Sequence, residues 1–281
     1  MLRSLSHSAR RLIGVEPPPI VPLVRLAGVI GTVSPLRSGL TLHGVAPLLE
    51  RAFRWPGAKA VALAINSPGG SAAQSSLIHN RVRALAAERK LPVHVFVEDV
   101  AASGGYWLAC AGDEIHVDTT SILGSIGVVT ASFGFPELLN RIGVERRLYT
   151  TGPYKAMLDP FRPEQATDVE RLKEIQADLF ESFKTLVLTR RAGKLKATEN
   201  ELFTGAIWSG RRAVEMGLAD GIGDVRQTLR ARFGEKVQMP GIGVRRGWLA
   251  RRLRPETAAG DWAGAALGAL EERALWARYG L

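Results

Sequence analysis

The chain has 281 residues, enough to bury a full hydrophobic core as one large domain or two small ones. Apolar residues make up 46% and charged residues 23%, which is typical of globular proteins and excludes a chain that is disordered throughout. The formal net charge of +10 suits an anionic partner, but the excess gathers near the two ends, where basic residues usually form a solvated tail.

Residues 1–22 are predicted to form a basic N-terminal segment and a linker, because the prolines of EPPPI prevent a helix. The apolar residues of this segment are Leu2, Leu5, Leu12 and Ile13. Their position among basic residues suits contact with an anionic membrane surface. No secretory signal and no membrane-spanning segment is expected, since charges and prolines interrupt every long apolar stretch. We therefore expect a cytoplasmic or peripherally membrane-associated protein.

Three short β-branched runs, at residues 23–33, 60–67 and 91–99, predict buried strands. Residues 75–90, between the second and third runs, predict a helix. Its apolar positions are Leu77, Ile78, Val82 and Leu85. Strand, helix and strand in this order imply a right-handed parallel crossover, so the predicted fold class is α/β.

The same alternation continues with a short helix at 104–112 and a strand at 114–118. After Pro163, residues 164–191 predict a long helix with one apolar stripe. The stripe consists of Val169, Leu172, Ile175, Leu179, Phe183 and Leu186. We expect one main domain over residues 23–240.

A basic, amphipathic tail is predicted over residues 241–281. Its apolar helical face consists of Trp262, Ala266, Leu267, Leu270 and Ala274. Packing of this face within the protein or its oligomer is favoured over lipid contact. The single cysteine, Cys110, excludes a disulfide within the chain and is expected to be a small buried residue.

Three glycine-rich stretches each follow a predicted strand: INSPGGS (65–71), ASGGYW (102–107) and LGSIGV (123–128). Alone, each is most often a turn. Ligands bind at the carboxyl ends of strands in open α/β sheets, so three such exits are expected to converge on one site. None of the three reads as a nucleotide-binding GxxxxGK[ST] or GxGxxG motif.

Ser103, within ASGGYW, is a candidate nucleophile, and a serine hydroxyl needs an adjacent base. None of the five histidines has a setting that favours this role. Lys155 lies in a loop held by Pro153 and Pro160, where desolvation would lower its pKa and make it a usable base. Taken alone, it would more often be a surface lysine.

The ordered motifs NSPGG, ASGGYW, GSIGV, GPYK and LFTGAIWSGRRAVEMGLADGIGD resemble those of the signal peptide peptidase A family of serine proteases. The resemblance runs from about Val24 to Asp224. It implies a Clp-protease/crotonase-like fold, a spiral of β-β-α units that assembles into rings. Residues 23–240 would then be the peptidase domain.

The resemblance also implies roles for individual residues. Ser103 would be the nucleophile, Lys155 the general base, and Ser125 the residue that orients the lysine amine. The backbone N–H groups of Gly70 and Gly104 would form the oxyanion hole. Glycine N–H groups suit this role because no side chain obstructs their approach to the oxyanion.

An extended peptide would lie along Val128 and Val129, adding itself to the sheet through main-chain hydrogen bonds. The implied substrates are unfolded or membrane-released peptides such as remnant signal peptides. The implied partner is a homo-oligomer with shared active sites. No nucleic acid, metal or cofactor is implied.

Two other functions remain open. A crotonase-type enzyme would use the same glycine N–H groups to stabilise an acyl-coenzyme A enolate and would need no serine. A non-catalytic scaffold, associated with a membrane or with nucleic acid, would use the basic ends, and its binding would weaken steeply with salt.

Overall fold

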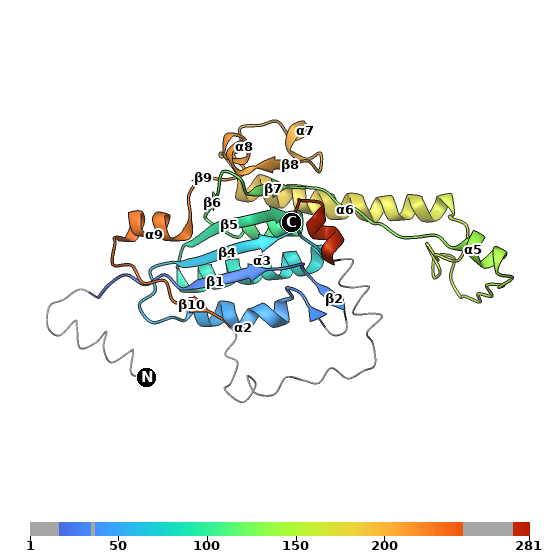
Figure 1. Ribbon diagram of the computed structural model, residues 1–281, viewed down its shortest axis with the longest axis horizontal. Helices are drawn as coiled ribbons and strands as arrows, with labels where there is room; N and C mark the ends of the chain where they lie inside the picture. The colour runs from blue at the N-terminus through green and yellow to red at the C-terminus, as the bar shows by residue number, and fades with distance from the viewer. Residues whose placement is uncertain (1–16, 35–36, 244–271) are drawn as a thin grey trace, which may run out of the picture. The chain divides into compact units, whose positions relative to one another are not determined.

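The computed structural model describes residues 17–34, 37–243 and 272–281 (Figure 1). Its contacts divide the chain into two compact units. The first unit comprises Met1–Ile126 and Leu186–Leu281, and the second comprises Gly127–Thr185. Several expectations lie outside the described residues: the membrane-facing residues Leu2, Leu5, Leu12 and Ile13, and the tail residues Trp262, Ala266, Leu267 and Leu270.

The first unit is built on a parallel sheet with the strand order β10-β1-β4-β5-β6-β9. The strands are β1 (Leu23–Ala27), β2 (Thr32–Ser34), β3 (Arg37–Ser38), β4 (Val61–Ser67), β5 (Val93–Ala102), β6 (Glu114–Val117), β7 (Ile122–Gly124), β8 (Ile207–Ser209), β9 (Gly221–Ile222) and β10 (Gly241–Ile242). The long strand β5 pairs with β6 along its first half and with β7 at its carboxyl end. β8 pairs antiparallel with β7. The predicted α/β class is confirmed.

The helices alternate with these strands along the chain. They are α2 (Leu42–Phe53), α3 (Ala72–Arg89), α4 (Gly104–Ala109), α5 (Pro136–Arg141), α6 (Ala166–Arg190), α7 (Glu199–Leu202), α8 (Gly210–Glu215) and α9 (Val225–Phe233). Residues 272–277 are also helical, and the Tyr279 hydroxyl after them donates to the Pro68 carbonyl. Among the described residues, no helix is long and apolar enough to cross a membrane.

The prediction of one strand over residues 23–33 is wrong. β1 ends at Ala27, and residues 32–34 pair with β3 instead. Gly28 and Gly31 have φ angles of 115° and 111°, so they turn the chain out of the extended conformation.

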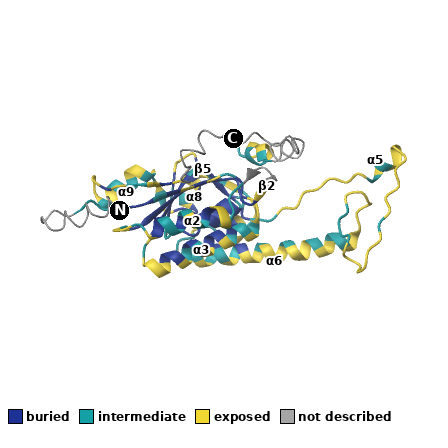
Figure 2. Cartoon of the chain, turned by 90° about the horizontal axis from the view of Figure 1, so that it is seen from below, coloured by how far each residue is buried: buried dark blue, intermediate teal, exposed yellow. Residues whose placement is uncertain are grey.

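The core lies in the central strands and in the helix faces that meet them (Figure 2). All seven residues of β4 are buried, as expected for a strand covered on both faces. On α3, Ile78, Val82 and Leu85 are buried at helical spacing. Leu77 was expected to join them but is 45% exposed, because one residue along a helix turns the side chain by about 100° away from the buried face.

The long helix predicted after Pro163 is present as α6, but its apolar stripe is only partly covered. Phe183 is buried, whereas Ile175 and Leu179 are each 39% exposed. Within the second unit, all of which the structure describes, Phe183 is the one buried residue. The second unit therefore has no hydrophobic core of its own.

A buried arginine, Arg191, connects the chain just after α6 to the sheet of the first unit. The Arg191 side chain is 2% exposed and donates to the Gly217 carbonyl and, at 2.7 Å, to Asp220. Asp220 also accepts from the Ile115 N–H and pairs with Lys194. Burial acts to raise the pKa of Asp220, but the hydrogen bonds from Arg191 and Lys194 outweigh it and lower that pKa.

Replacing Arg191 with Met should lower the free energy of unfolding by about 3–5 kcal/mol, because it leaves a partly buried carboxylate without its main partner. Arg212→Met is the matched control, since Arg212 pairs with Glu215 on an exposed surface. This second change should cost less than about 1 kcal/mol. Urea unfolding of both variants and the wild type measures the difference, and equal losses would contradict the structural role given to Arg191.

Candidate active site

The three glycine-rich stretches lie at the carboxyl ends of neighbouring parallel strands. Ser103 follows β5 directly, and Ser125 follows β7 directly. Ala102 and Gly124 are register partners, and the Ser103 N–H donates to the Gly124 carbonyl at 2.8 Å. The two serines therefore leave the sheet side by side, as convergence at the strand ends requires.

The turn after β4 packs against the start of α4. A Cβ atom on Gly69 would lie 2.8 Å from the Ser103 Cβ and 2.9 Å from the Gly104 nitrogen. A Cβ atom on Gly104 would overlap the Ser75 hydroxyl and lie 3.4 Å from the Gly70 nitrogen. Glycines at these positions allow the two backbone segments to approach more closely than side chains would permit.

Two backbone N–H groups in this contact have no acceptor among the described residues. Within the described part of the chain, neither the Gly70 N–H nor the Gly104 N–H donates a hydrogen bond to the protein. Gly70 has a φ of 139°, and a Cβ there would overlap the Ile30 carbonyl oxygen. Neighbouring free N–H donors next to a serine are the arrangement that stabilises a negatively charged oxygen.

Ser103 and Ser125 have unusual backbone conformations. Their φ angles are 52° and 50°, in the region that L-residues rarely adopt. Ser103 is the N-cap of α4, yet its side chain makes no capping hydrogen bond. Both serines are half-buried, so each hydroxyl is held by a strained backbone and remains partly accessible. Such strain is concentrated at functional sites in proteins.

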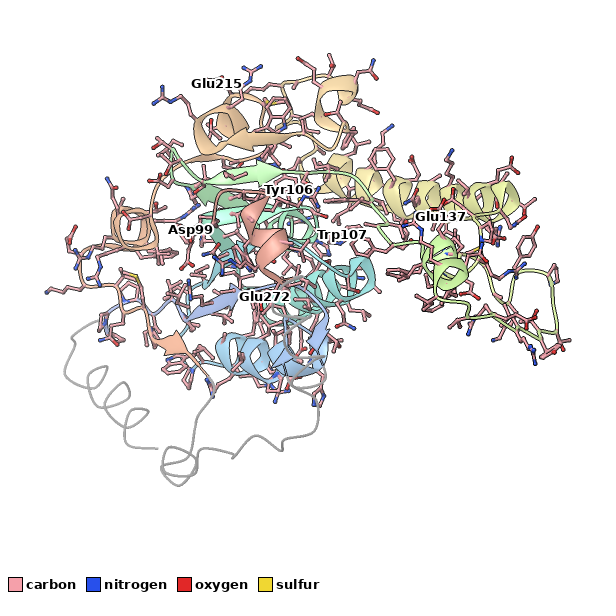
Figure 3. All side chains as sticks on the ribbon, turned by 45° about the vertical axis from the view of Figure 1, so that its right-hand side comes forward. Asp99, Tyr106, Trp107, Glu137, Glu215 and Glu272 are labelled. Atoms are coloured by element: carbon pink, nitrogen blue, oxygen red, sulfur yellow. The ribbon has the colours of Figure 1, made fainter. Side chains whose placement is uncertain are left out.

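The helix that follows Ser103 is firmly anchored. All six residues of α4 are buried, and the Tyr106 hydroxyl donates to the Leu218 carbonyl at 2.8 Å. Figure 3 shows Tyr106 and Trp107 on this helix and Asp99 on β5 before it. Cys110, at the end of α4, is fully buried, and burial raises the pKa of its thiol to about 12. It is therefore the inert small residue that was expected.

A bulge in β5 sets the direction of the chain before Ser103. Ile65 pairs with Val97, but Ser67, two residues later on β4, pairs with Ala101. The Asn66 side chain fills the gap by accepting from the Val100 N–H and donating to Asp99 at 2.5 Å. Bulges near active sites commonly redirect the following residue in this way.

The remaining predicted residues belong to the second unit, so the structure does not bring them together with Ser103 in one compact body. Lys155 is exposed in a turn in which its N–H donates to the Gly152 carbonyl. Val128 and Val129 lie in irregular backbone, because β7 ends at Gly124 and the described chain offers them no partner strand.

Sequence reasoning missed several residues that shape the site. Gly69 and Ser75 contact the Ser103–Gly104 segment, and Ile30 supports Gly70 through its carbonyl. Gly69 lies within the SPGG motif, so the signal was present in the sequence. Ile30 carries no local signal, because its role depends on a parallel bridge to Gly70 across 40 residues of chain.

A family model, Peptidase family S49, matches residues 86–237. A protein of Brucella abortus named Na(+)/H(+) antiporter NhaA is 51% identical over 272 residues, 93% of this chain and 37% of that protein. A putative signal peptide peptidase SppA of Enterococcus faecium is 32% identical over 180 residues, 63% of this chain and 51% of its own length. A putative protease of Synechocystis sp. is 32% identical over 191 residues, 65% of this chain and 67% of its own length.

The chain thus spans only part of several relatives, 37% of the Brucella protein and 51% of the Enterococcus protein. Most of the Brucella protein that carries the antiporter name lies outside the segment that matches this chain. The family match covers β5, Ser103, α4, β7 and Ser125, whereas the Gly69–Gly70 turn lies before its first residue.

Gly104→Ala should lower the free energy of unfolding by about 1–3 kcal/mol, because the new Cβ overlaps the buried Ser75 hydroxyl. In a Ser75→Ala background the same change should cost less, since that hydroxyl is gone. A double-mutant cycle by urea unfolding measures the coupling. Gly44→Ala is the control: its Cβ meets its closest neighbour at 3.4 Å on helix α2, so it should be neutral or stabilising. Additive costs for Gly104→Ala and Ser75→Ala would contradict the close approach.

Proposed function

The chain belongs to peptidase family S49, the family of signal peptide peptidase A, and from this membership we propose that it is a serine endopeptidase with a Ser-Lys dyad. Ser103 is the proposed nucleophile and Lys155 the proposed general base. The observation that carries the proposal is the packing of the Gly69–Gly70 turn against Ser103, with two N–H donors nearby that have no acceptor in the part of the chain that the structure describes.

The proposed reaction follows the chemistry of acyl transfer. The Ser103 oxygen attacks the peptide carbonyl carbon while the Lys155 amine accepts the hydroxyl proton. The Gly70 and Gly104 N–H groups stabilise the oxyanion of the tetrahedral intermediate. The lysine then returns a proton to the leaving amine, and water hydrolyses the acyl-enzyme by the same steps. Ser125 is the proposed hydrogen-bond partner that orients the lysine.

The proposed substrates are unfolded or membrane-released peptides, such as remnant signal peptides, with small or apolar residues before the scissile bond. An extended peptide would pair with the backbone at Val128 and Val129. Support comes from the backbone at these residues, which belongs to no strand of the described chain, so its N–H and C=O groups are available to an added strand.

We further propose that the active protein is a homo-oligomer in which Ser103 and Lys155 come from adjoining subunits. The second unit exposes large apolar side chains, which a neighbouring copy would cover. These residues are Val129, Phe133, Phe135, Leu138, Ile142, Val144, Tyr149, Tyr154, Phe161, Ile175 and Leu179. Lys155 is exposed in the single chain, so the desolvation that a lysine base requires would also come from assembly.

The antiporter name of the Brucella relative is not carried over, because the matched segment makes up 37% of that protein. Peripheral membrane contact through the basic N-terminal residues stays a proposal from the sequence. Acyl-coenzyme A chemistry is the alternative that the free glycine N–H groups also suit, and it differs in needing no serine hydroxyl.

Ser103→Ala and Lys155→Ala should each abolish hydrolysis of an unstructured apolar peptide while keeping the assembly size of the wild type. Each removes a group that takes part in every turnover. Ser182→Ala and Lys173→Ala, both exposed on α6, are the matched controls and should retain activity. Hydrolysis that survives Ser103→Ala at unchanged assembly size would overturn the proposed nucleophile and favour the acyl-binding alternative.

Mixing the two inactive variants tests the shared site. If serine and lysine come from adjoining subunits, randomly mixed Ser103→Ala and Lys155→Ala chains should regain about a quarter of wild-type activity, since one neighbour pairing in four is intact. Mixed assemblies are prepared by co-expression, and their size is measured by light scattering. Activity that stays at the level of either variant would place both residues of a working site in one chain.

A further inference from the structure

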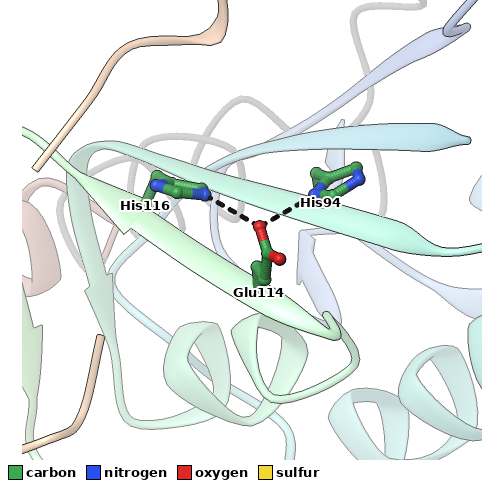
Figure 4. Close-up of side chains that lie close together, drawn as sticks. All are labelled: His94, Glu114 and His116. Atoms are coloured by element: carbon green, nitrogen blue, oxygen red, sulfur yellow. Dashed lines mark hydrogen bonds and ion pairs between the residues drawn. The ribbon is translucent and has the colours of Figure 1, made fainter. Parts of the chain in front are cut away.

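Three ionisable side chains gather on one face of the sheet at the amino end of β5, away from Ser103 (Figure 4). His94 on β5 and Glu114 on β6 are register partners, and His116 lies two residues after Glu114. All three side chains therefore point to the same face. Eight residues of β5 lie between His94 and Ser103, so the two are about 30 Å apart along the strand. The cluster is thus remote from the proposed catalytic residues.

The spacing of the three side chains suits a bound metal ion. His94 Nδ1 and His116 Nε2 lie 3.4 Å and 3.3 Å from the same Glu114 oxygen. The three ligand atoms all lie within 4.8 Å of one another. Bonds of about 2.0–2.1 Å around a tetrahedral zinc ion separate its ligand atoms by about 3.3 Å. Two of the three separations already have this length.

His94 gives an independent indication of a missing ligand. It is 2% exposed, and in the described part of the chain its ring nitrogens form no hydrogen bond: Nε2 has no partner, and Nδ1 has only the 3.4 Å contact with the Glu114 carboxylate. An unsatisfied buried polar group costs free energy that a bound ion would recover.

We propose that His94, Glu114 and His116 bind a divalent transition-metal ion of the zinc type, with water as the fourth ligand. Two imidazoles and one carboxylate are a donor set for zinc and its transition-metal neighbours, whereas magnesium and calcium prefer oxygen ligands. This site is independent of the proposed peptidase function.

Arg232 on α9 would compete with the ion for the Glu114 carboxylate. Its guanidinium donates to the same Glu114 oxygen, so it balances the carboxylate charge in the metal-free protein. The Arg232 side chain is 46% exposed and can turn towards solvent when an ion binds. Aromatic side chains pack against both imidazole rings: Phe233 contacts His94 edge-on, and Phe96 stacks on His116.

The test is equilibrium dialysis of the full chain against Zn²⁺ alone. The wild type should bind one equivalent at this site, and Glu114→Gln and His116→Ala should each weaken that binding by at least about tenfold. Arg232→Gln should tighten binding, because it removes the competing cation and keeps all three ligands. His43→Ala, an exposed histidine on α2, is the control and should leave binding unchanged.

Replacing Zn²⁺ with Co²⁺ supplies a second readout on the wild type, the intense visible absorption of a four-coordinate site. Circular dichroism of each metal-free variant identifies loss of fold. Lack of zinc binding by the wild type at micromolar concentrations would overturn the proposal. So would binding unaffected by both Glu114→Gln and His116→Ala, or binding weakened in a folded Arg232→Gln variant.

Discussion

The close approach of two backbone turns at the carboxyl edge of the sheet is the constraint on which the candidate site depends. Gly69 lies against Ser103 and Gly104, and Gly70 against Ile30, at distances that leave no room for a Cβ atom on either glycine. The Ile30 carbonyl holds the first turn by accepting from the Ser71 N–H. Because Gly69 places no side chain between the two segments, their N–H groups can face one small volume beside the serine hydroxyl. A side chain at Gly69 would push the turn away from Ser103 and Gly104.

The strained backbone of Ser103 has to be stabilised by its surroundings, since a residue in this region of φ costs about 1–3 kcal/mol. Before the serine, the Asn66 amide holds the bulge of β5. After it, α4 is buried along its whole length, and Arg190 from the end of α6 donates to the carbonyl of Cys110. Contacts on both sides therefore fix the serine, so its conformation does not depend on its own preference.

Much of this arrangement could be predicted from the sequence, because the strongest local signals were also structural ones. Continuous apolar runs predicted β4 and β5, and the three glycine-rich stretches predicted the edge where the serines lie. The break after Ala27 was missed because an apolar run does not reveal positive φ angles at Gly28 and Gly31. The cluster around Glu114 was missed for a different reason: its members become neighbours only through the register of two strands, which no local pattern specifies.

In a single chain, the first unit has a hydrophobic core and the second unit does not. The first unit buries its own core and holds the proposed nucleophile and oxyanion donors in place. The second unit buries one residue and leaves Lys155 exposed to solvent. In the proposed dyad, an isolated chain would hold its serine in a buried framework and its lysine in solvent. Association that covers the apolar residues of the second unit would then also desolvate the lysine, so assembly itself would switch on proteolysis.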